Sequence, residues 1–145
     1  MVIGVDIVKE QLRIASGEVL SINQADVQIT GHAFECRINA EDPITFLPCP
    51  GQVHLFHAPG GNGIRVDSHL YSGYKIPPYY DSLIAKLISF GDNREQALIR
   101  MQNALDEILV DGIRTNIPLQ RGLVRDAEFH KGSVNIHYLE QKLSM

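Results

Sequence analysis

The chain has 145 residues, of which 44% are hydrophobic and 21% are charged, and its net charge is −4. This composition is typical of a soluble globular domain, and the small acidic excess argues against nucleic-acid and anionic-membrane partners. No apolar run approaches the ~20 residues of a membrane span, and the start has no secretory-signal pattern, so we expect a cytoplasmic protein.

The first predicted element is a short amphipathic helix over residues 4–16, with Val8 and Leu12 on its apolar face and Gly17 as its stop. A helix this short is marginal alone, and it begins almost at the first methionine. We therefore expect the chain to be a piece of a longer protein. Residues 18–30 are predicted to be a connection whose last residues begin a short strand.

The stretch Gly31–Asp42, GHAFECRINAED, has the period-2 pattern of a strand with one buried and one polar face. Arg37 is the candidate of greatest interest on the polar face, because Glu35 and Asn39 flank it and are placed to hold its planar guanidinium. Such a guanidinium can bind an anionic or carbonyl-like ligand through its N–H donors. The alternative is a surface ion pair contributing ~0–1 kcal/mol. The apolar residues of the pattern are Phe34, Cys36 and Ile38.

The middle of the chain alternates turn signals with short strand patterns. Clusters of glycine and proline predict the turns, and alternating or continuous apolar residues predict the strands, the last of which is apolar on both faces as in a central strand. The predicted strands are 53–56, 64–67 and 83–90, and the turns are 43–51, 58–63 and 71–80.

The clearest helix is predicted from Arg94 to Val110, capped by Asp92 and ended by Gly112. Two weaker helices are predicted at 117–125 and 138–143, with a Gly/Ser turn between them. Strands therefore cluster in the middle and helices at the ends. This order predicts the α+β class, with a mainly antiparallel sheet and flanking helices.

No complete catalytic constellation is visible in the sequence. The run APGGNG lacks the GK[ST] ending of a phosphate loop, so a hairpin turn explains it better. Cys36 and Cys49 are too few for a zinc motif or a disulfide framework, and we predict no metal site. Arg65 with Asp67, and Asp81 with Lys86, are candidate surface ion pairs.

Five motifs occur in order along the chain: GHAFECRINAED, FLPCPG, HAPGGNGIRVDSHLYSGYKIPPYYDSLIAKL, DGIRTNI and NIHYLE. They strongly resemble the C-terminal portion of the biotin carboxylase family, and the resemblance covers essentially all 145 residues. The resemblance is closest to the stand-alone bacterial subunit of acetyl-CoA carboxylase. Related domains occur in pyruvate and propionyl-CoA carboxylases.

The resemblance implies that residues 1–29 are the tail end of an ATP-grasp domain plus a connection, and that 30–145 are the C-terminal domain. Family enzymes use MgATP and bicarbonate to carboxylate biotin on a carrier protein. Their ATP loop, metal ligands and bicarbonate-binding residues lie upstream of the resembling region. We therefore expect ATP and Mg²⁺ to be bound mainly outside this chain, and the isolated chain to be inactive.

The same resemblance assigns roles to five residues. Arg37 matches the arginine that meets the biotin ureido oxygen and stabilises its enolate-like form, and Asp81 matches a carboxylate near biotin. Ile136 matches an apolar residue that packs on adenine. Asn62 and Arg65 match homodimer contacts, with Asn62 standing where some relatives carry Phe. From the residues alone, Asp81 is equally an ordinary strand-start acid and Ile136 a core isoleucine.

The resemblance also implies partners: the biotin carboxyl carrier protein, the carboxyltransferase subunits of acetyl-CoA carboxylase in fatty acid synthesis, and a second copy of the enzyme. Two alternatives stay open. One is a non-catalytic module for dimerisation or carrier docking. The other is the same domain from a pyruvate or propionyl-CoA carboxylase.

Overall fold

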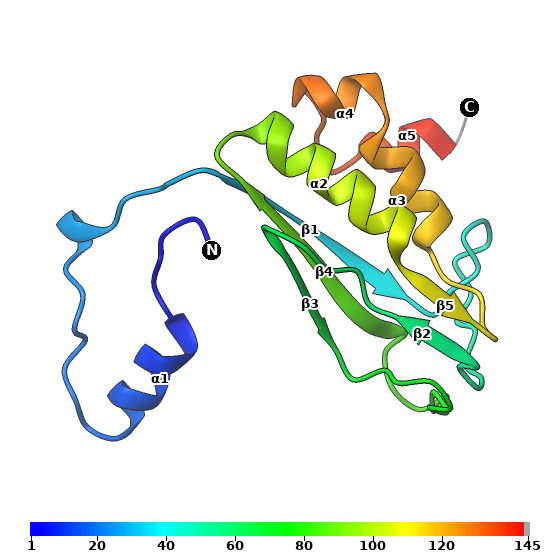
Figure 1. Cartoon of the computed structure of the whole chain (residues 1–145), viewed down its shortest axis with the longest axis horizontal. Helices are drawn as coiled ribbons and strands as arrows, with labels where there is room; N and C mark the ends of the chain where they lie inside the picture. The colour runs from blue at the N-terminus through cyan, green and yellow to red at the C-terminus, as the bar shows by residue number, and fades with distance from the viewer. Residues whose placement is uncertain (144–145) are drawn as a thin grey trace.

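The computed structural model describes residues 1–143 and consists of two antiparallel sheets with flanking helices (Figure 1). The larger sheet has the strand order β1-β4-β3, and the smaller pairs β2 with β5. This confirms the expected α+β class. No helix in residues 1–143 is long and apolar enough to cross a membrane.

The strands are β1 His32–Asn39, β2 Leu55–His57, β3 Ile64–Ser68, β4 Leu83–Gly91 and β5 Leu109–Asp111. The helices are α1 Ile7–Ala15, a 3-10 turn Gln24–Asp26, α2 Arg94–Glu107, α3 Ile117–Val124, α4 Ala127–Lys131 and α5 Tyr138–Leu143.

The core lies between one face of the larger sheet and helix α2. Cys36 and Ile38 of β1 and Leu87 of β4 are buried there, as the period-2 pattern of the sequence predicts. They meet the apolar stripe of α2, which includes Leu98 and Met101. Burying each large apolar side chain contributes ~1.5–3 kcal/mol. Strand β4 is the central strand, as predicted from its apolar residues on both faces. Helix α2 covers only one face of the sheet.

Helix α2 differs from its prediction at both ends. Its N-cap is Asn93 rather than Asp92, and the Asn93 side chain accepts a hydrogen bond from the backbone N–H of Gln96 at 2.9 Å. The helix ends at Glu107, because the next residues turn into the extended strand β5 and pair with β2. The strand expected at 53–56 lies at Leu55–His57 for the same reason.

The segment after α3 contains a helix, α4, where only a turn was predicted. Asp126 caps α4 by accepting from the N–H groups of Glu128 (2.8 Å) and Phe129 (3.1 Å), and Gly132 ends it with φ 77°. Asp126 also accepts from the Tyr138 hydroxyl at 2.5 Å and from Lys142. These contacts hold the pKa of Asp126 well below its usual range. One carboxylate thus fastens both α4 and α5.

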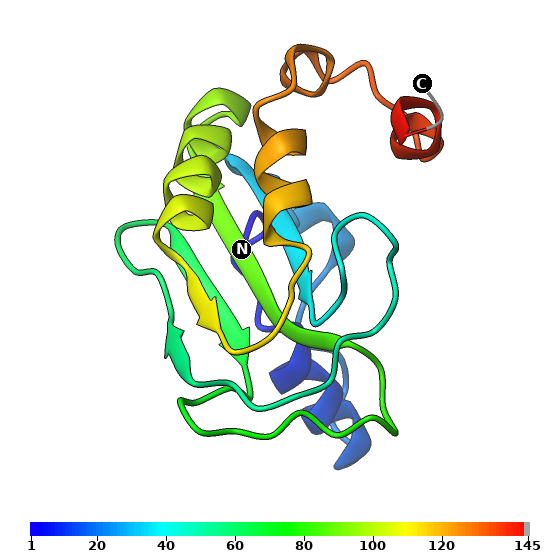
Figure 2. The same ribbon diagram turned by 90° about the vertical axis from the view of Figure 1, so that its right-hand side faces the viewer.

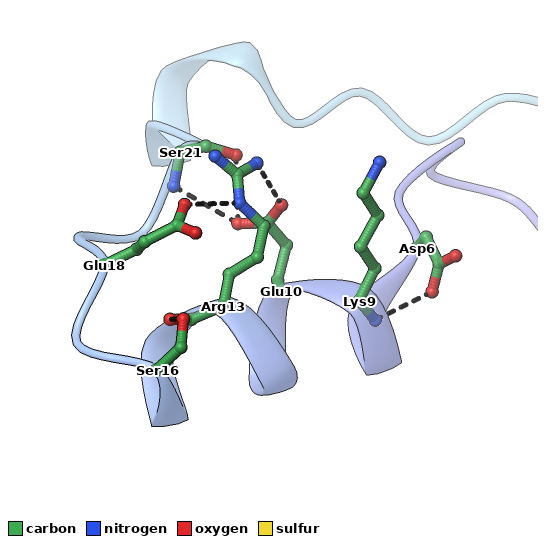
Figure 3. A network of polar contacts seen from close by, with 7 residues as sticks. All are labelled: Asp6, Lys9, Glu10, Arg13, Ser16, Glu18 and Ser21. Atoms are coloured by element: carbon green, nitrogen blue, oxygen red, sulfur yellow. Dashed lines mark hydrogen bonds and ion pairs between the residues drawn. The ribbon is translucent and has the colours of Figure 1, made fainter.

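Helix α1 stands apart from the sheet in Figure 1. The expected helix is confirmed, but its apolar residues Val8 and Leu12 are exposed, and no residue of α1 is buried. Its polar face is fixed locally, because Glu10 accepts from the hydroxyl and N–H of Ser21 and Arg13 bonds Glu18 at 2.8 Å (Figure 3). These bonds to Ser21, with Arg13 nearby, lower the pKa of Glu10.

Candidate functional site

The face of the larger sheet opposite α2 carries a row of charged residues. Arg37 of β1 lies opposite Lys86 of β4, which in turn lies opposite Asp67 of β3. Paired residues in neighbouring strands project from the same face, so these three side chains form one row across the sheet. The next row is Glu35, Ile88 and Arg65. The polar face expected from the sequence is therefore a property of the whole sheet and not of β1 alone.

The guanidinium of Arg37 is exposed, and within residues 1–143 it has no hydrogen bond or ion pair. The expectation that Glu35 and Asn39 hold it is wrong. The Asn39 amide instead donates to Glu41 at 3.1 Å, and Glu35, which lies opposite Ile88, makes no bond to Arg37. Arg37 thus presents all five of its N–H donors outward.

The backbone of Arg37 is held much more firmly than its side chain. The Asn116 amide donates to the carbonyl of Arg37 at 3.0 Å, and Gln120 donates to the same oxygen at 3.4 Å. Asn116 also accepts from the N–H of Asn39 at 2.9 Å, and its own N–H donates to the Asn39 carbonyl at 3.1 Å. The segment leading into α3 therefore closes the free edge of β1 at Arg37.

The acidic end of the GHAFECRINAED stretch is structural. Glu41 accepts from Ser82 and so joins the end of β1 to the start of β4. Asp42 accepts from the N–H groups of Thr45 and Ile44, each at 2.9 Å, and from Arg114. These donors lower the pKa of Asp42 to about 2. Neither carboxylate is free to act on a ligand, which leaves Glu35 and Arg37 as the charged side chains of the stretch that have no bond among residues 1–143.

Asp81 lies just before the start of β4, and at ~3.3 Å per residue it is roughly 17 Å from Lys86 along the chain. The expected ion pair between Asp81 and Lys86 is absent among the described residues, because Lys86 faces Asp67 instead. Asp81 is exposed and lines a hollow of about 390 Å³. The hollow is also lined by His69, Tyr74, Ile76, Pro77, Tyr80, Leu83 and Ile84. Asp81 is therefore available to a ligand but is not beside Arg37.

Ile136 is 89% exposed, so it is not a core residue of this chain. It lies in the link between α4 and α5, whose ends are tied together through Asp126 and Tyr138. A single exposed isoleucine is common on protein surfaces. The structure does not bring it into the charged row of the sheet.

Asn62 and Arg65 lie at the other edge of the sheet, in and just after the turn that precedes β3. The turn is tight: Gly63 has φ 76°, and a Cβ there would lie 2.4 Å from the carbonyl oxygen of Phe90. Arg65 makes two 2.8 Å bonds to Asp67, which raise the pKa of the arginine and lower that of the aspartate. This confirms the expected surface pair.

Residues 1–143 contain no group of three histidine, cysteine or acidic side chains that could hold a metal ion. Cys36 and Cys49 are both free thiols. Burial raises the pKa of the Cys36 thiol to about 12, so it stays protonated and packs as a core residue, as expected.

Comparison with known proteins places these features in a family. The profile described as "Biotin carboxylase C-terminal domain" matches residues 35–141. A biotin carboxylase from Pseudomonas aeruginosa is 71% identical over 145 residues, which are 100% of this chain and 32% of the relative. A pyruvate carboxylase subunit from Methanothermobacter thermautotrophicus is 47% identical over 142 residues, which are 97% of this chain and 29% of the relative.

A solved structure is similarly close. The biotin carboxylase domain dimer of 2-oxoglutarate carboxylase from Hydrogenobacter thermophilus, in complex with MgADP, ADP and bicarbonate, matches with a TM-score of 0.95 and 47% identity. The match covers 97% of this chain and 31% of that chain, so this chain spans about a third of the length of its relatives. The chain belongs to the biotin carboxylase C-terminal domain family.

Proposed function

We propose that this chain forms the C-terminal part of a biotin carboxylase, which uses MgATP and bicarbonate to carboxylate biotin on a carrier protein. The observation that carries the proposal is Arg37, a guanidinium without a partner among residues 1–143 on a strand whose backbone is fixed on both sides. Residues 30–145 would be the C-terminal domain, and residues 1–29 would be the end of an ATP-grasp domain. The rest of that ATP-grasp domain would cover the exposed apolar side of α1.

Arg37 is suited to stabilise the negative charge on the biotin ureido oxygen in its enolate-like form. That charge develops when the neighbouring nitrogen loses its proton, before this nitrogen attacks the carboxyl carbon. A preorganised cation placed where charge develops acts like an oxyanion-hole donor, and one such donor lowers a barrier by ~3–4 kcal/mol. The planar fork of arginine offers two parallel N–H groups to one oxygen, which a lysine cannot do. The fixed β1 backbone keeps the cost of orienting that fork low.

The other candidate residues take supporting roles in this proposal. The exposed Ile136 fits the edge of an adenine ring, because its apolar surface is already held out of the core. Asp81 would face the biotin side through its hollow, and Asn62 and Arg65 would contact a second copy of the enzyme. Magnesium would be bound by residues outside this chain.

The proposal extends to a cytoplasmic enzyme that serves a biotin carboxyl carrier protein and, with carboxyltransferase subunits, supplies fatty acid synthesis. The 71% identity to a bacterial biotin carboxylase favours this over a pyruvate carboxylase, since the Methanothermobacter subunit is only 47% identical. The dimer named for the Hydrogenobacter structure supports a homodimer here as well.

The proposal is tested by a chimera in which this chain replaces the matching C-terminal third of the Pseudomonas biotin carboxylase. We expect the chimera to form carboxybiotin from biotin, MgATP and bicarbonate. A chimera that folds and dimerises or binds the carrier protein, but forms no carboxybiotin, would contradict the proposal and favour a non-catalytic module.

A further inference from the structure

Strand β1 is an edge strand of the larger sheet, so every second backbone group along it lacks a strand partner. At the position of Arg37 this edge is closed by Asn116 rather than by another strand, through its side chain and through its backbone N–H, which donates to the Asn39 carbonyl at 3.1 Å. The Asn116 amide has a donor and an acceptor in one plane, as a peptide group does. It uses both on β1, donating to the Arg37 carbonyl and accepting from the Asn39 N–H.

Asn116 occupies the N-cap position of α3, where an asparagine side chain ordinarily accepts a hydrogen bond from the helix it starts. Here it makes no such bond. The side chain turns away from α3 toward β1, and the residue is only 6% exposed. The helix therefore gives up its side-chain cap, which is typically worth ~1 kcal/mol, while the amide is committed to the strand.

The bonds of Asn116 affect the position of Arg37. Since its guanidinium has no partner in residues 1–143, the place where it projects depends on the orientation of its backbone. On one side that backbone is held by β4, where Arg37 faces Lys86. On the other side it is held by Asn116, with a longer second bond from Gln120.

We infer that Asn116 is a positioning residue for carboxyl transfer, acting on biotin only through Arg37. The inference rests on the proposed function. Misplacing a reacting group by about 1 Å can cost on the order of 100-fold in rate. A loss of Asn116 should therefore reduce turnover while leaving nucleotide binding unchanged, because the residue holds the Arg37 peptide and not Ile136.

The test uses Asn116→Asp in the chimera. This substitution keeps size and the oxygen that accepts from Asn39, but it removes the donor to the Arg37 carbonyl and places a carboxylate oxygen against it. We expect kcat for biotin carboxylation to fall about 10- to 100-fold, with the KM for ATP within two-fold of the parent.

Gln102→Glu is the matched control. Gln102 donates to the Val124 carbonyl at 2.8 Å, so this change also converts a carbonyl-binding amide to a carboxylate, but between α2 and the end of α3. The new carboxylate would face His130, which lies 3.0 Å from the Gln102 amide. We expect Tm to fall no more than in Asn116→Asp and kcat to stay within two-fold of the parent. If both variants lose kcat in proportion to Tm, or if Asn116→Asp leaves kcat unchanged, the inference is overturned.

Arg37→Ala in the same chimera separates this inference from the proposed function. If that variant keeps full activity, the role proposed for Arg37 fails. If it is inactive and Asn116→Asp is normal, only the positioning role fails. Should Asn116→Asp not fold, Gln120→Leu decides: a two-fold or larger fall in kcat at unchanged Tm supports positioning from α3, and an unchanged kcat overturns it.

Discussion

The two ends of the C-terminal domain each hold one exposed candidate residue, and they hold it in different ways. Arg37 projects from a strand in the sheet, next to the buried Ile38, and its backbone is fixed by the neutral amide of Asn116. Ile136 lies in a link outside the sheet, and the flanking helices are fastened by the carboxylate of Asp126. Figure 2 shows α5 well away from the strands.

This difference indicates how easily each exposed residue should be released by local unfolding. A residue next to the core inherits the stability of the whole domain, and an amide does not titrate. A residue in a peripheral segment held by a charge can be released alone, because local opening costs much less than global unfolding. Two predictions test this contrast directly, and a third concerns an exposed ion pair at the other edge of the sheet.

The largest expected effect is on the strand side. Ile38→Ala removes a fully buried side chain beside Arg37. We expect the free energy of unfolding to fall by ~2–5 kcal/mol. The matched change Ile136→Ala removes an exposed isoleucine, so its effect should be within ~0.5 kcal/mol. Urea denaturation of both variants measures the difference, and equal losses would show that Ile136 is not held in the open.

A smaller, local effect is expected at Asp126. Its folded pKa lies below the ordinary 3.8, so its stabilisation is present above that value and is lost as the pH falls toward the folded pKa. Hydrogen exchange in 127–143 should therefore rise in acid before exchange in β1 does. Asp126→Asn should raise it already at neutral pH. Simultaneous loss of protection in both regions would remove the contrast.

The smallest effect is expected at the exposed pair of Arg65 and Asp67. Although its two bonds are short, both side chains are well exposed to water. A double-mutant cycle with alanine at each position should give a coupling of ~0–1 kcal/mol that weakens in high salt. A coupling of several kcal/mol would indicate that this edge of the sheet is a stability element rather than a surface for a partner.

Local pattern predicted the elements that bury apolar residues with a regular period. Strands β1, β3 and β4 and the start of α2 follow directly from such periodicity. Strand β5 was missed because Ile108 and Leu109 continue the apolar spacing of the preceding helix, whereas pairing with the distant β2 makes Leu109–Asp111 extended. Tertiary pairing overrides local propensity in this way.

The candidate site could be predicted only in part, because local pattern does not show contacts between residues that are distant in sequence. The pattern placed Arg37 on a polar strand face, but its neighbours along the chain proved not to hold it. The residue that fixes its backbone, Asn116, lies far away in sequence, within the DGIRTNI motif, and looks like an ordinary helix cap. Whether Ile136 is core or exposed depends on how α4 and α5 dock, which no local pattern encodes.

The central claim is that Arg37 stabilises charge on biotin, and Arg37→Lys in the chimera tests it most directly. The variant keeps the positive charge and loses the planar fork. We expect kcat for carboxybiotin formation to fall by ~10²–10³-fold, with Tm and the KM for ATP unchanged. A kcat within about three-fold of the parent would contradict the claim and leave Arg37 as a surface residue of the sheet.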